Sequence, residues 1–456
     1  MGFQSLGITL VAAVCFHSFQ GLAQPVDSNR LVVLISLDGL AGHYLDDPKA
    51  TMPTLRALAK DGAQARMLSV TPSVTWPNHV SIATGCTPAH HGVVGNNYFD
   101  RETSKSVTLI ADPVFDQDQI VKVPTIYDAV KGKGLVTAAV RWPASRNGKS
   151  LDWTVPDIHP LDLRTSCSTP QLVDECKKAN LWFPKDANST ATDAQLFTDE
   201  CCTKIFNLIL EKHRPNIALL HLADIDHAQH LKGPNSPEAY KAIEESDHHV
   251  GEIWDILKRD YPGTATLIIV SDHGFSAIKR ILNTKVILRN AGLLDVKGPR
   301  VTSGPISVVS QGGTLMVYIN DSNRAAIAEK VTSVFKDMEG VDQVVSPTDV
   351  KARGLSTPSE DPHFPDMIVY SKDGYVFGDT AAGALPFIEK PEVTGSHGHN
   401  PDFPNLHASF VAWGAGIKPG VRPGLIPNID VAPTIAKLLN VSLPKADGKA
   451  IDSILK

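Results

Sequence analysis

The sequence predicts an α/β fold in which a central, mostly parallel sheet is flanked by helices on both faces. Short apolar runs rich in β-branched residues alternate along the chain with segments of helical periodicity. Runs that are apolar throughout are typical of parallel strands buried on both faces. The chain has 456 residues, 42% of them hydrophobic, so it can bury the core of one large, elaborated domain.

Strands of this sheet are expected at residues 31–37, 136–140, 217–222, 266–270, 367–370 and 409–413. A helix is expected after the first strand, because M-P-T-L-R-A-L-A-K-D-G has helical periodicity. It would begin at Thr51 or Pro53 and stop at Gly62. This helix would form the first crossover.

Two stretches interrupt the alternation of strands and helices. Residues 143–203 are rich in Pro, Asp, Ser and Cys and have few periodic segments, which predicts a loop or lid of extracellular type. Residues 280–365 carry their own pattern, T-L-M-V-Y-I-N followed by S-N-R-A-A-I-A-E-K-V-T-S-V-F-K. This second stretch predicts a small α+β appendage.

The first 23 residues have the pattern of a secretory signal peptide. An apolar core, L-G-I-T-L-V-A-A-V-C-F, is followed by G-L-A before Gln24, although no Lys or Arg precedes the core. An uncleaved membrane anchor is the alternative, but the core is short against the ~20 residues that a span requires. We therefore expect a secreted or periplasmic protein whose folded domain covers residues 24–456 and has no stable membrane span.

Four of the six cysteines cluster near the end of the first irregular stretch, at Cys167, Cys176, Cys201 and Cys202. The cluster is typical of disulfides in an oxidising compartment. A zinc knuckle is the alternative, but C-x8-C followed by C-C is a poor spacing for a tetrahedral site. Neighbouring cysteines do not readily bond each other, so Cys201 and Cys202 are expected to have separate partners.

The charge pattern argues against general binding of polyanions. The formal net charge is -6, and the chain has no long run of Lys or Arg. Binding to a nucleic-acid duplex is therefore not expected. Metal ions, and not a basic surface, would attract a phosphorylated substrate.

Acidic and histidine residues follow several of the predicted strands. Asp38, Asp272 and His273 fall at carboxyl ends of strands, and Asp226 and His230 lie just beyond one. Ligands bind above the carboxyl ends of strands in open α/β sheets, so these side chains should meet at one rim. A lone Asp-His pair is more often a structural hydrogen bond, but the repeated placement favours a functional site.

Carboxylate oxygens and imidazole nitrogens are suitable ligands for Zn²⁺, and a catalytic zinc takes three protein ligands while leaving a position open. Two such sets are available. The Asp226 set comprises Asp226, His230 and His397, and the Asp38 set comprises Asp38, Asp272 and His273. Two ions ~3.5–4 Å apart can stabilise the attacking and leaving oxygens of an in-line displacement.

Thr75, in T-W-P-N-H, is the expected attacking group. A threonine hydroxyl is a weak nucleophile that metal coordination can activate, so Thr75 is also expected to be a ligand. Alternatively, Thr75 caps the helix that V-S-I-A-T-G predicts. Both roles are compatible, because the positive end of a helix dipole favours an anionic nucleophile.

These motifs resemble those of the nucleotide pyrophosphatase/phosphodiesterase branch of the alkaline phosphatase superfamily. The resemblance begins with T-W-P-N-H-V-S-I-A-T-G and continues through H-H-G-V-V-G-N-N-Y-F-D. D-x-x-x-H-x-x-G-P, S-D-H-G and G-x-H-G follow in the family's order. The resemblance extends from Leu31 to the segment Ile429 to Leu439, so it covers most of the chain.

The resemblance implies an alkaline-phosphatase-like fold and two Zn²⁺ ions per chain, held by the Asp226 set and by the Asp38 set together with Thr75. It also implies that Asn96 hydrogen-bonds a phosphoryl oxygen. Two neighbouring histidines are expected not to be ligands: His227, because His230 has the required spacing from Asp226, and His399, which is better placed to support a ligand.

The chain departs from nucleotide-cleaving relatives near the Asp226 set. His221 stands five residues before Asp226 where those relatives carry Tyr, and Ala223 to Ile225 replace an acidic E-x-P. His221 and Trp76 are nevertheless assigned to the substrate pocket, where Trp76 could stack on an aromatic group. Alternatively, Trp76 only packs against the core.

The expected function is a two-zinc hydrolase of phosphodiester or pyrophosphate bonds that acts through a phosphothreonine. Its substrate would be a small phosphodiester or a nucleotide-like molecule. A phosphomonoesterase on the same scaffold is the first alternative, but no Arg or Lys occurs between Ser69 and Asn97 to offset a dianion, which favours a diester. A metal-stabilised binding protein without catalysis is the alternative of another class.

Overall fold

The computed structural model describes Gly2 and residues 27–111, 114–182, 197–298, 300–381, 383, 385–389 and 391–456. The predicted signal segment lies outside the described residues except for Gly2. Within the described ranges, no helix is both long enough and apolar enough to cross a membrane.

The central sheet has eight strands among the described residues, in the order β21-β2-β20-β8-β1-β7-β5-β6. β1 pairs in parallel with both β7 and β8, whereas β20 runs antiparallel to β8 and β2. The strands are β1 (Leu31–Leu37), β2 (Ala63–Leu68), β5 (Thr137–Val140), β6 (Trp153–Val155), β7 (Ile217–Leu222), β8 (Ala265–Val270), β20 (Ala408–Gly414) and β21 (Leu425–Pro427). The mostly parallel sheet is thus confirmed.

Helices cover both faces of this sheet, as predicted. Alternate residues of β1 enter two separate cores, because successive side chains of a strand point to opposite faces. One face packs against α1 (Pro53–Lys60), α7 (Pro170–Lys178), α9 (Asp199–His213) and α11 (Pro237–Asp260). The other packs against α2 (Thr75–Thr84), α5 (Ile126–Lys131) and α14 (Val431–Leu439). The first crossover helix, α1, lies where the sequence predicts it.

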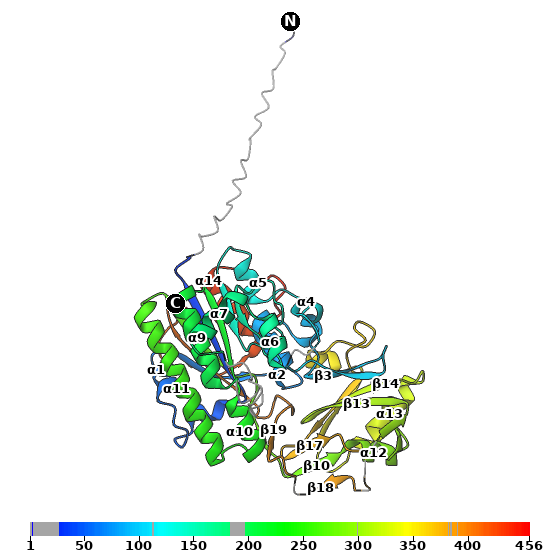
Figure 1. Cartoon of the computed structure of the whole chain (residues 1–456). Coiled ribbons are helices and arrows are strands. Elements are labelled where there is room, and N and C mark those ends of the chain that lie inside the picture. The colour runs from blue at the N-terminus through cyan, green and yellow to red at the C-terminus, as the bar shows by residue number, and fades with distance from the viewer. Residues whose placement is uncertain are drawn as a thin grey trace.

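The appendage is built on a second, antiparallel sheet in the order β13-β14-β16-β15, which Figure 1 shows at the lower right. Its elements are β13 (Ile306–Gln311), β14 (Thr314–Ile319), α13 (Arg324–Phe335), β15 (Val341–Val345), η2 (Val350–Arg353) and β16 (Met367–Ser371). The assignment of residues 367–370 to the central sheet is therefore wrong. Both faces of β16 are buried, so its apolar run looks like that of a central strand.

Smaller elements extend the appendage past residue 365. A three-stranded sheet joins β17, β10 and β18 beside it. These elements are β10 (Arg280–Asn283), α12 (Thr284–Asn290), β11 (Asp295–Lys297), β12 (Arg300–Ser303), β17 (Tyr375–Gly378) and β18 (Phe387–Ile388). The remaining short elements are η1 (Gly42–Asp46), α3 (Pro88–His91), β3 (Asn97–Asp100), β4 (Lys105–Thr108), α4 (Gln117–Ile120), β9 (Ser276–Ala277), β19 (Gly395–Ser396), η3 (Asn428–Asp430) and η4 (Asp452–Ile454).

The stretch 143–203 is more regular than the predicted loop or lid. It contains β6 at the edge of the central sheet, α6 (Leu161–Cys167), α7 and the start of α9. α7 begins with Pro170 and buries three residues in the core, which the sequence pattern did not separate from a loop. The described cysteines, Cys86, Cys167, Cys176, Cys201 and Cys202, are free thiols in this structure, without the expected disulfides.

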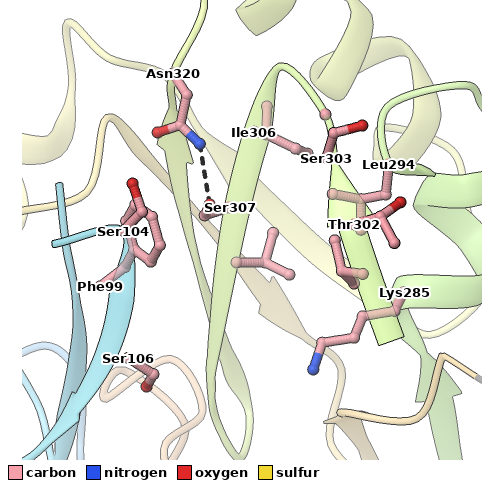
Figure 2. Close-up of a pocket in the computed structure, with 13 residues that line it drawn as sticks. Phe99, Ser104, Ser106, Lys285, Leu294, Thr302, Ser303, Ile306, Ser307 and Asn320 are labelled. Atoms are coloured by element: carbon pink, nitrogen blue, oxygen red, sulfur yellow. Dashed lines mark hydrogen bonds between the residues drawn. The ribbon is translucent and has the colours of Figure 1, made fainter. Parts of the chain in front are cut away.

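A cleft of about 500 Å³ lies between the β3–β4 hairpin and the strands β12 and β13 (Figure 2). Serine and threonine side chains line much of it, and Lys285 extends from α12 toward the hairpin. None of the predicted metal ligands lines this cleft. The predicted metal ligands therefore lie in another part of the structure.

Trp76 joins α2 to the appendage. Its side chain is 0% exposed and belongs to a buried cluster that also includes Val80 of α2, Met316 of β14 and Tyr370 of β16. Close by, the hydroxyl groups of Thr71 and Tyr370 are hydrogen-bonded at 2.8 Å. The ring thus fills the space between the two parts of the fold.

We predict that Trp76→Ala lowers the free energy of unfolding by ~3–5 kcal/mol, as expected for truncating a fully buried aromatic side chain. Chemical denaturation would measure the change. Trp413→Ala is the matched control. Trp413 is only partly buried, against the core on one face of the central sheet, so its truncation should lower the free energy of unfolding by less. A loss no larger than that of the control would contradict the packing role.

Candidate metal site and nucleophile

The carboxyl ends of three neighbouring strands support the site. Asp38 directly follows β1, and its backbone N–H donates to the carbonyl of Leu222 at the end of β7 (2.8 Å). Asp272 lies just beyond β8, and Asp226 lies in α10 (Asp224–Lys232), which follows β7. The parallel pairing of β1 with β7 and β8 brings these aspartates together. The predicted convergence at one rim therefore occurs.

The Asp38 set forms a compact buried group. The possible ligand atoms of Asp38, Asp272 and His273 all lie within 4.8 Å of one another. His273 Nε2 is 3.1 Å from Asp272 Oδ2 and 3.4 Å from Asp38 Oδ1. The arrangement offers two carboxylates and one imidazole to a single ion.

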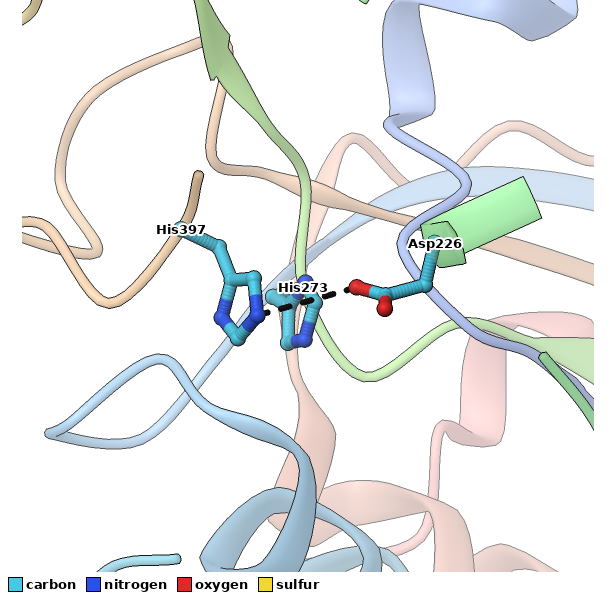
Figure 3. Close-up of side chains that lie close together, drawn as sticks. All are labelled: Asp226, His273 and His397. Carbon is cyan, nitrogen blue, oxygen red and sulfur yellow. Dashed lines mark ion pairs between the residues drawn. The ribbon is translucent and has the colours of Figure 1, made fainter. Parts of the chain in front are cut away.

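Two members of the Asp226 set form a second group with His273. The possible ligand atoms of Asp226, His273 and His397 lie within 4.8 Å of one another, and His397 Nε2 is 3.6 Å from Asp226 Oδ1. The rings of His273 and His397 stack with centroids 3.7 Å apart, and Figure 3 shows them beside Asp226. His230 Nε2 is 3.4 Å from Asp226 Oδ1. All six predicted ligands therefore lie in one site, with His273 close to both sets.

The residues present fit a pair of cations. Four atoms of these side chains, Asp38 Oδ1, Asp226 Oδ1, Asp272 Oδ2 and His273 Nε2, are buried and have no hydrogen-bond partner. Leaving buried acceptors unpaired is costly, and metal coordination would satisfy them. Oxygen and nitrogen donors of this kind suit Zn²⁺.

The electrostatics of the protein without metal point the same way. Burial raises the pKa of Asp38 and that of Asp272 well above the usual value, and a neighbouring carboxylate adds to each shift. Burial lowers the pKa of His397 to about 4, and burial also lowers the pKa of His273 well below its usual value. Neutral imidazole is the form that binds metals, and a bound cation would favour ionised carboxylates.

Thr75 is the first residue of α2, so it is not the cap that one interpretation expected. Val74 occupies the N-cap position, and the Thr75 hydroxyl makes no hydrogen bond among the described residues. The carbonyl of Thr75 accepts a bond from His79 Nδ1–H (2.8 Å), and that nitrogen is 3.7 Å from Asp272 Oδ2. The carbonyl of Ser73 accepts from His397 Nδ1–H (3.2 Å). These contacts link the start of α2 and the residues before it to Asp272 of the Asp38 set and to His397 of the Asp226 set.

Asn96 is hydrogen-bonded to the start of α2. Its side-chain oxygen accepts from the backbone N–H of Trp76 (2.9 Å), and the backbone N–H of Asn96 donates to Gln311 Oε1 (3.0 Å). The side-chain NH₂ group of Asn96 makes no hydrogen bond among the described residues, so it can donate to a ligand. Gln311, from β13 of the appendage, carried no sequence signal.

Trp76 and His221 were expected in the substrate pocket, but both side chains are buried. Trp76 is 0% exposed in the core, and His221 is 3% exposed. His221 Nδ1–H donates to the Arg141 carbonyl (3.1 Å), and Nε2 lies 3.0 Å from Asp38 Oδ2. In this structure His221 supports a predicted ligand and offers no face to a substrate.

His79 is the residue that sequence reasoning left without a role. It is fully buried, and its ring centroid lies 4.4 Å from that of His221. Its place at the end of T-W-P-N-H was the available signal. His227 is exposed, and His399 Nε2–H donates to the Tyr375 carbonyl (2.7 Å). Neither belongs to the clusters of possible ligand atoms among the described residues.

Comparison with known proteins agrees with this geometry. A family model described as Type I phosphodiesterase / nucleotide pyrophosphatase matches residues 32–400. Human ectonucleotide pyrophosphatase/phosphodiesterase family member 1 is 27% identical over 427 residues, which cover 90% of this chain and 40% of that protein. Venom phosphodiesterase 2 of Crotalus adamanteus is 27% identical over 54% of the chain and 27% of its own length. The chain thus spans two fifths or less of these relatives.

Solved structures share the fold. Human ectonucleotide pyrophosphatase/phosphodiesterase 5 superposes with a TM-score of 0.70 at 20% identity, over 94% of this chain and 100% of that chain. An inactive form of the murine protein in complex with AMP gives a TM-score of 0.70 at 18% identity over the same shares. The alkaline-phosphatase-like fold is thereby confirmed.

Gly398 offers a test of the site that does not depend on turnover. It has φ +83°, and an added Cβ would overlap the Gln311 carbonyl oxygen. Its N–H donates to Ser73 (3.0 Å), next to the His397 contact. We predict that Gly398→Ala displaces His397 and lowers the affinity for one zinc ion at least tenfold, measured by competition with a chelating dye.

Gly420→Ala is the control for this substitution. Gly420 also has positive φ (+71°), but no atom lies within 4 Å of its added Cβ. Both substitutions carry the cost of a left-handed conformation, and only Gly398→Ala pushes on the site. Equal zinc affinities in the two variants would contradict the role of His397 as a ligand.

Proposed function

The chain belongs to the Type I phosphodiesterase / nucleotide pyrophosphatase family, and from this premise we propose that it is a two-zinc hydrolase of phosphodiester or pyrophosphate bonds. One observation carries the proposal. Buried, unpartnered ligand atoms of Asp38, Asp226, Asp272 and His273 converge at the strand ends. His79, which donates to the Thr75 carbonyl, links the start of α2 to Asp272 of this group.

In this proposal, one Zn²⁺ is held by Asp226, His230 and His397. The Asp38 set together with Thr75 would hold the other, and His273 also lies within 4.8 Å of the ligand atoms of Asp226 and His397. When bound, the ions would supply Lewis acidity that stabilises charge on the attacking and leaving oxygens. The unpartnered buried atoms and the chemistry of the donors support cation binding by these residues.

Thr75 is proposed as the nucleophile. Its Oγ would form a bond to phosphorus as the bond to the leaving alkoxide breaks, giving a phosphothreonine that water then hydrolyses. The amide NH₂ of Asn96 would donate to a phosphoryl oxygen. His79 would hold the Thr75 backbone through the 2.8 Å bond to its carbonyl.

The proposed substrate is a small phosphodiester or a nucleotide-like molecule. The names of the relatives support nucleotides, and so does the complex of the murine neighbour with AMP. The ectoenzyme names of those relatives also support action outside the cytoplasm. A nucleobase would have to be recognised by side chains other than Trp76 and His221, since both are buried.

We predict that Thr75→Ala lowers kcat by at least a thousandfold while both zinc ions stay bound, because Thr75 is one ligand among several but the sole nucleophile. Thr84→Ala is the control, since Thr84 lies on the same helix and its hydroxyl bonds to the Val80 carbonyl and the Cys86 N–H, away from the site. A tenfold change in rate corresponds to only ~1.4 kcal/mol of activation free energy. Residual activity within tenfold of wild type would therefore contradict the assignment of Thr75 as the nucleophile.

We predict that removing metal with a chelator abolishes hydrolysis of bis-p-nitrophenyl phosphate and lowers Tm, and that added zinc restores both. The carboxylates of the site lose their counter-charge when metal leaves, which destabilises the fold. Rates on this diester, on the monoester p-nitrophenyl phosphate and on a nucleoside triphosphate should favour the first or the last. A preference for the monoester would support the phosphomonoesterase instead.

A further inference from the structure

α10, the helix that carries Asp226 and His230, begins without a cap of its own. Ala223 occupies the N-cap position and makes no side-chain capping bond. Alanine is a poor N-cap, because it leaves the first N–H groups of the helix without an acceptor. Those N–H groups must therefore find a partner elsewhere.

Asp199 supplies the missing acceptors from a different helix. It is the first residue of α9 and is 1% exposed. Its Oδ1 accepts from the Ala223 N–H (2.9 Å), and its Oδ2 accepts from the Asp224 N–H (3.0 Å). The carboxylate thus caps α10 at the positive end of the helix dipole, two residues before Asp226.

Arg141 links this cap to the other set of ligands. Its Nη1 is 3.0 Å from Asp199 Oδ1, and the residue is 8% exposed. Its carbonyl accepts from His221 Nδ1–H, and His221 Nε2 lies beside Asp38 Oδ2. The backbone of Arg141 has φ +55°, which non-glycine residues rarely adopt, and bonds at both its N–H and its carbonyl hold it there.

On the basis of the function proposed above, we infer that Asp199 and Arg141 are positioning residues of the metal site. They form one continuous chain of contacts from the N-terminus of α10, through Asp199, Arg141 and His221, to Asp38. The chain fixes the Asp226 helix relative to Asp38, so the two ions keep their spacing. Neither residue touches the substrate or the reacting atoms.

A merely structural role is the alternative. Buried ion pairs often contribute little net stability, so their presence alone says nothing about function. Asp199 differs because both of its oxygens bind backbone N–H groups next to a ligand. Substitution of Asp199 should therefore have a larger effect on the free energy of metal binding than on the free energy of unfolding.

The first test is Asp199→Asn, which replaces one acceptor oxygen with an NH₂ group and removes the charge. We expect the affinity for the Asp226-set zinc to fall by about 10–100-fold, as when outer-sphere partners of ligands are lost. The other zinc should change less than threefold. Dye competition would measure both affinities, and anomalous scattering from zinc in crystals would show which ion is lost.

Asp366→Asn is the matched control. Asp366 is 4% exposed, pairs with Arg101 (2.8 Å) and accepts from the Ile319 N–H (2.7 Å), but it lies in the appendage. It should lower Tm while leaving both zinc affinities unchanged. Hydrogen exchange should increase at the Ala223 and Asp224 amides in the Asp199 variant only.

Arg141→Lys provides a second variant should Asp199→Asn fail to fold. Lysine keeps the charge but lacks the planar guanidinium, so the affinity for the same zinc ion should fall by a smaller factor. Unchanged affinity for both ions in the folded variants would overturn the positioning role. A wild-type protein that binds two zinc ions but hydrolyses no diester would contradict the proposed function alone, and one that binds no zinc would overturn both.

Discussion

The mutual repulsion of buried carboxylates is the constraint on which the rest of the site depends. Asp38, Asp226 and Asp272 lie together at the strand ends, and histidines are their ion-pair partners within the described part of the chain. Burial and the neighbouring carboxylates disfavour ionisation of Asp38 and Asp272, so the metal-free arrangement is poorly compensated. Cations reverse that balance, and the parallel pairing of β1 with β7 and β8 keeps the ligands close enough for cations to do so.

The sequence predicted the convergence of ligands because it depends on a general property of α/β sheets. An apolar run followed at once by Asp38 or Asp272 places that side chain at the active rim. The same reasoning failed for β16, whose two faces are buried in different cores of the appendage. An apolar run shows that a strand is buried, but it does not show which sheet contains the strand.

For a similar reason, the sequence did not predict which way the side chains of α2 point. All ten residues of this helix are buried, so no polar stripe reveals which side faces the substrate. Ile82 and Ala83 enter the core of the central sheet, whereas Trp76 and Val80 enter the cluster shared with the appendage. Contacts of Asn96 with Gln311 and of Asp199 with α10 join residues distant in sequence, and no local pattern encodes them.

The exposure of the ligands determines from which side a substrate can approach. Asp272 and His273 are 0% exposed and form the floor of the site, whereas the His230 side chain is 35% exposed and Asn96 is half-buried. In the proposed function, the phosphoryl group would enter past His230 and Asn96 and reach Thr75 from this more open side. Trp76 and His221 are buried, so the residues around His230 and Asn96 would then determine which ester groups the site accepts.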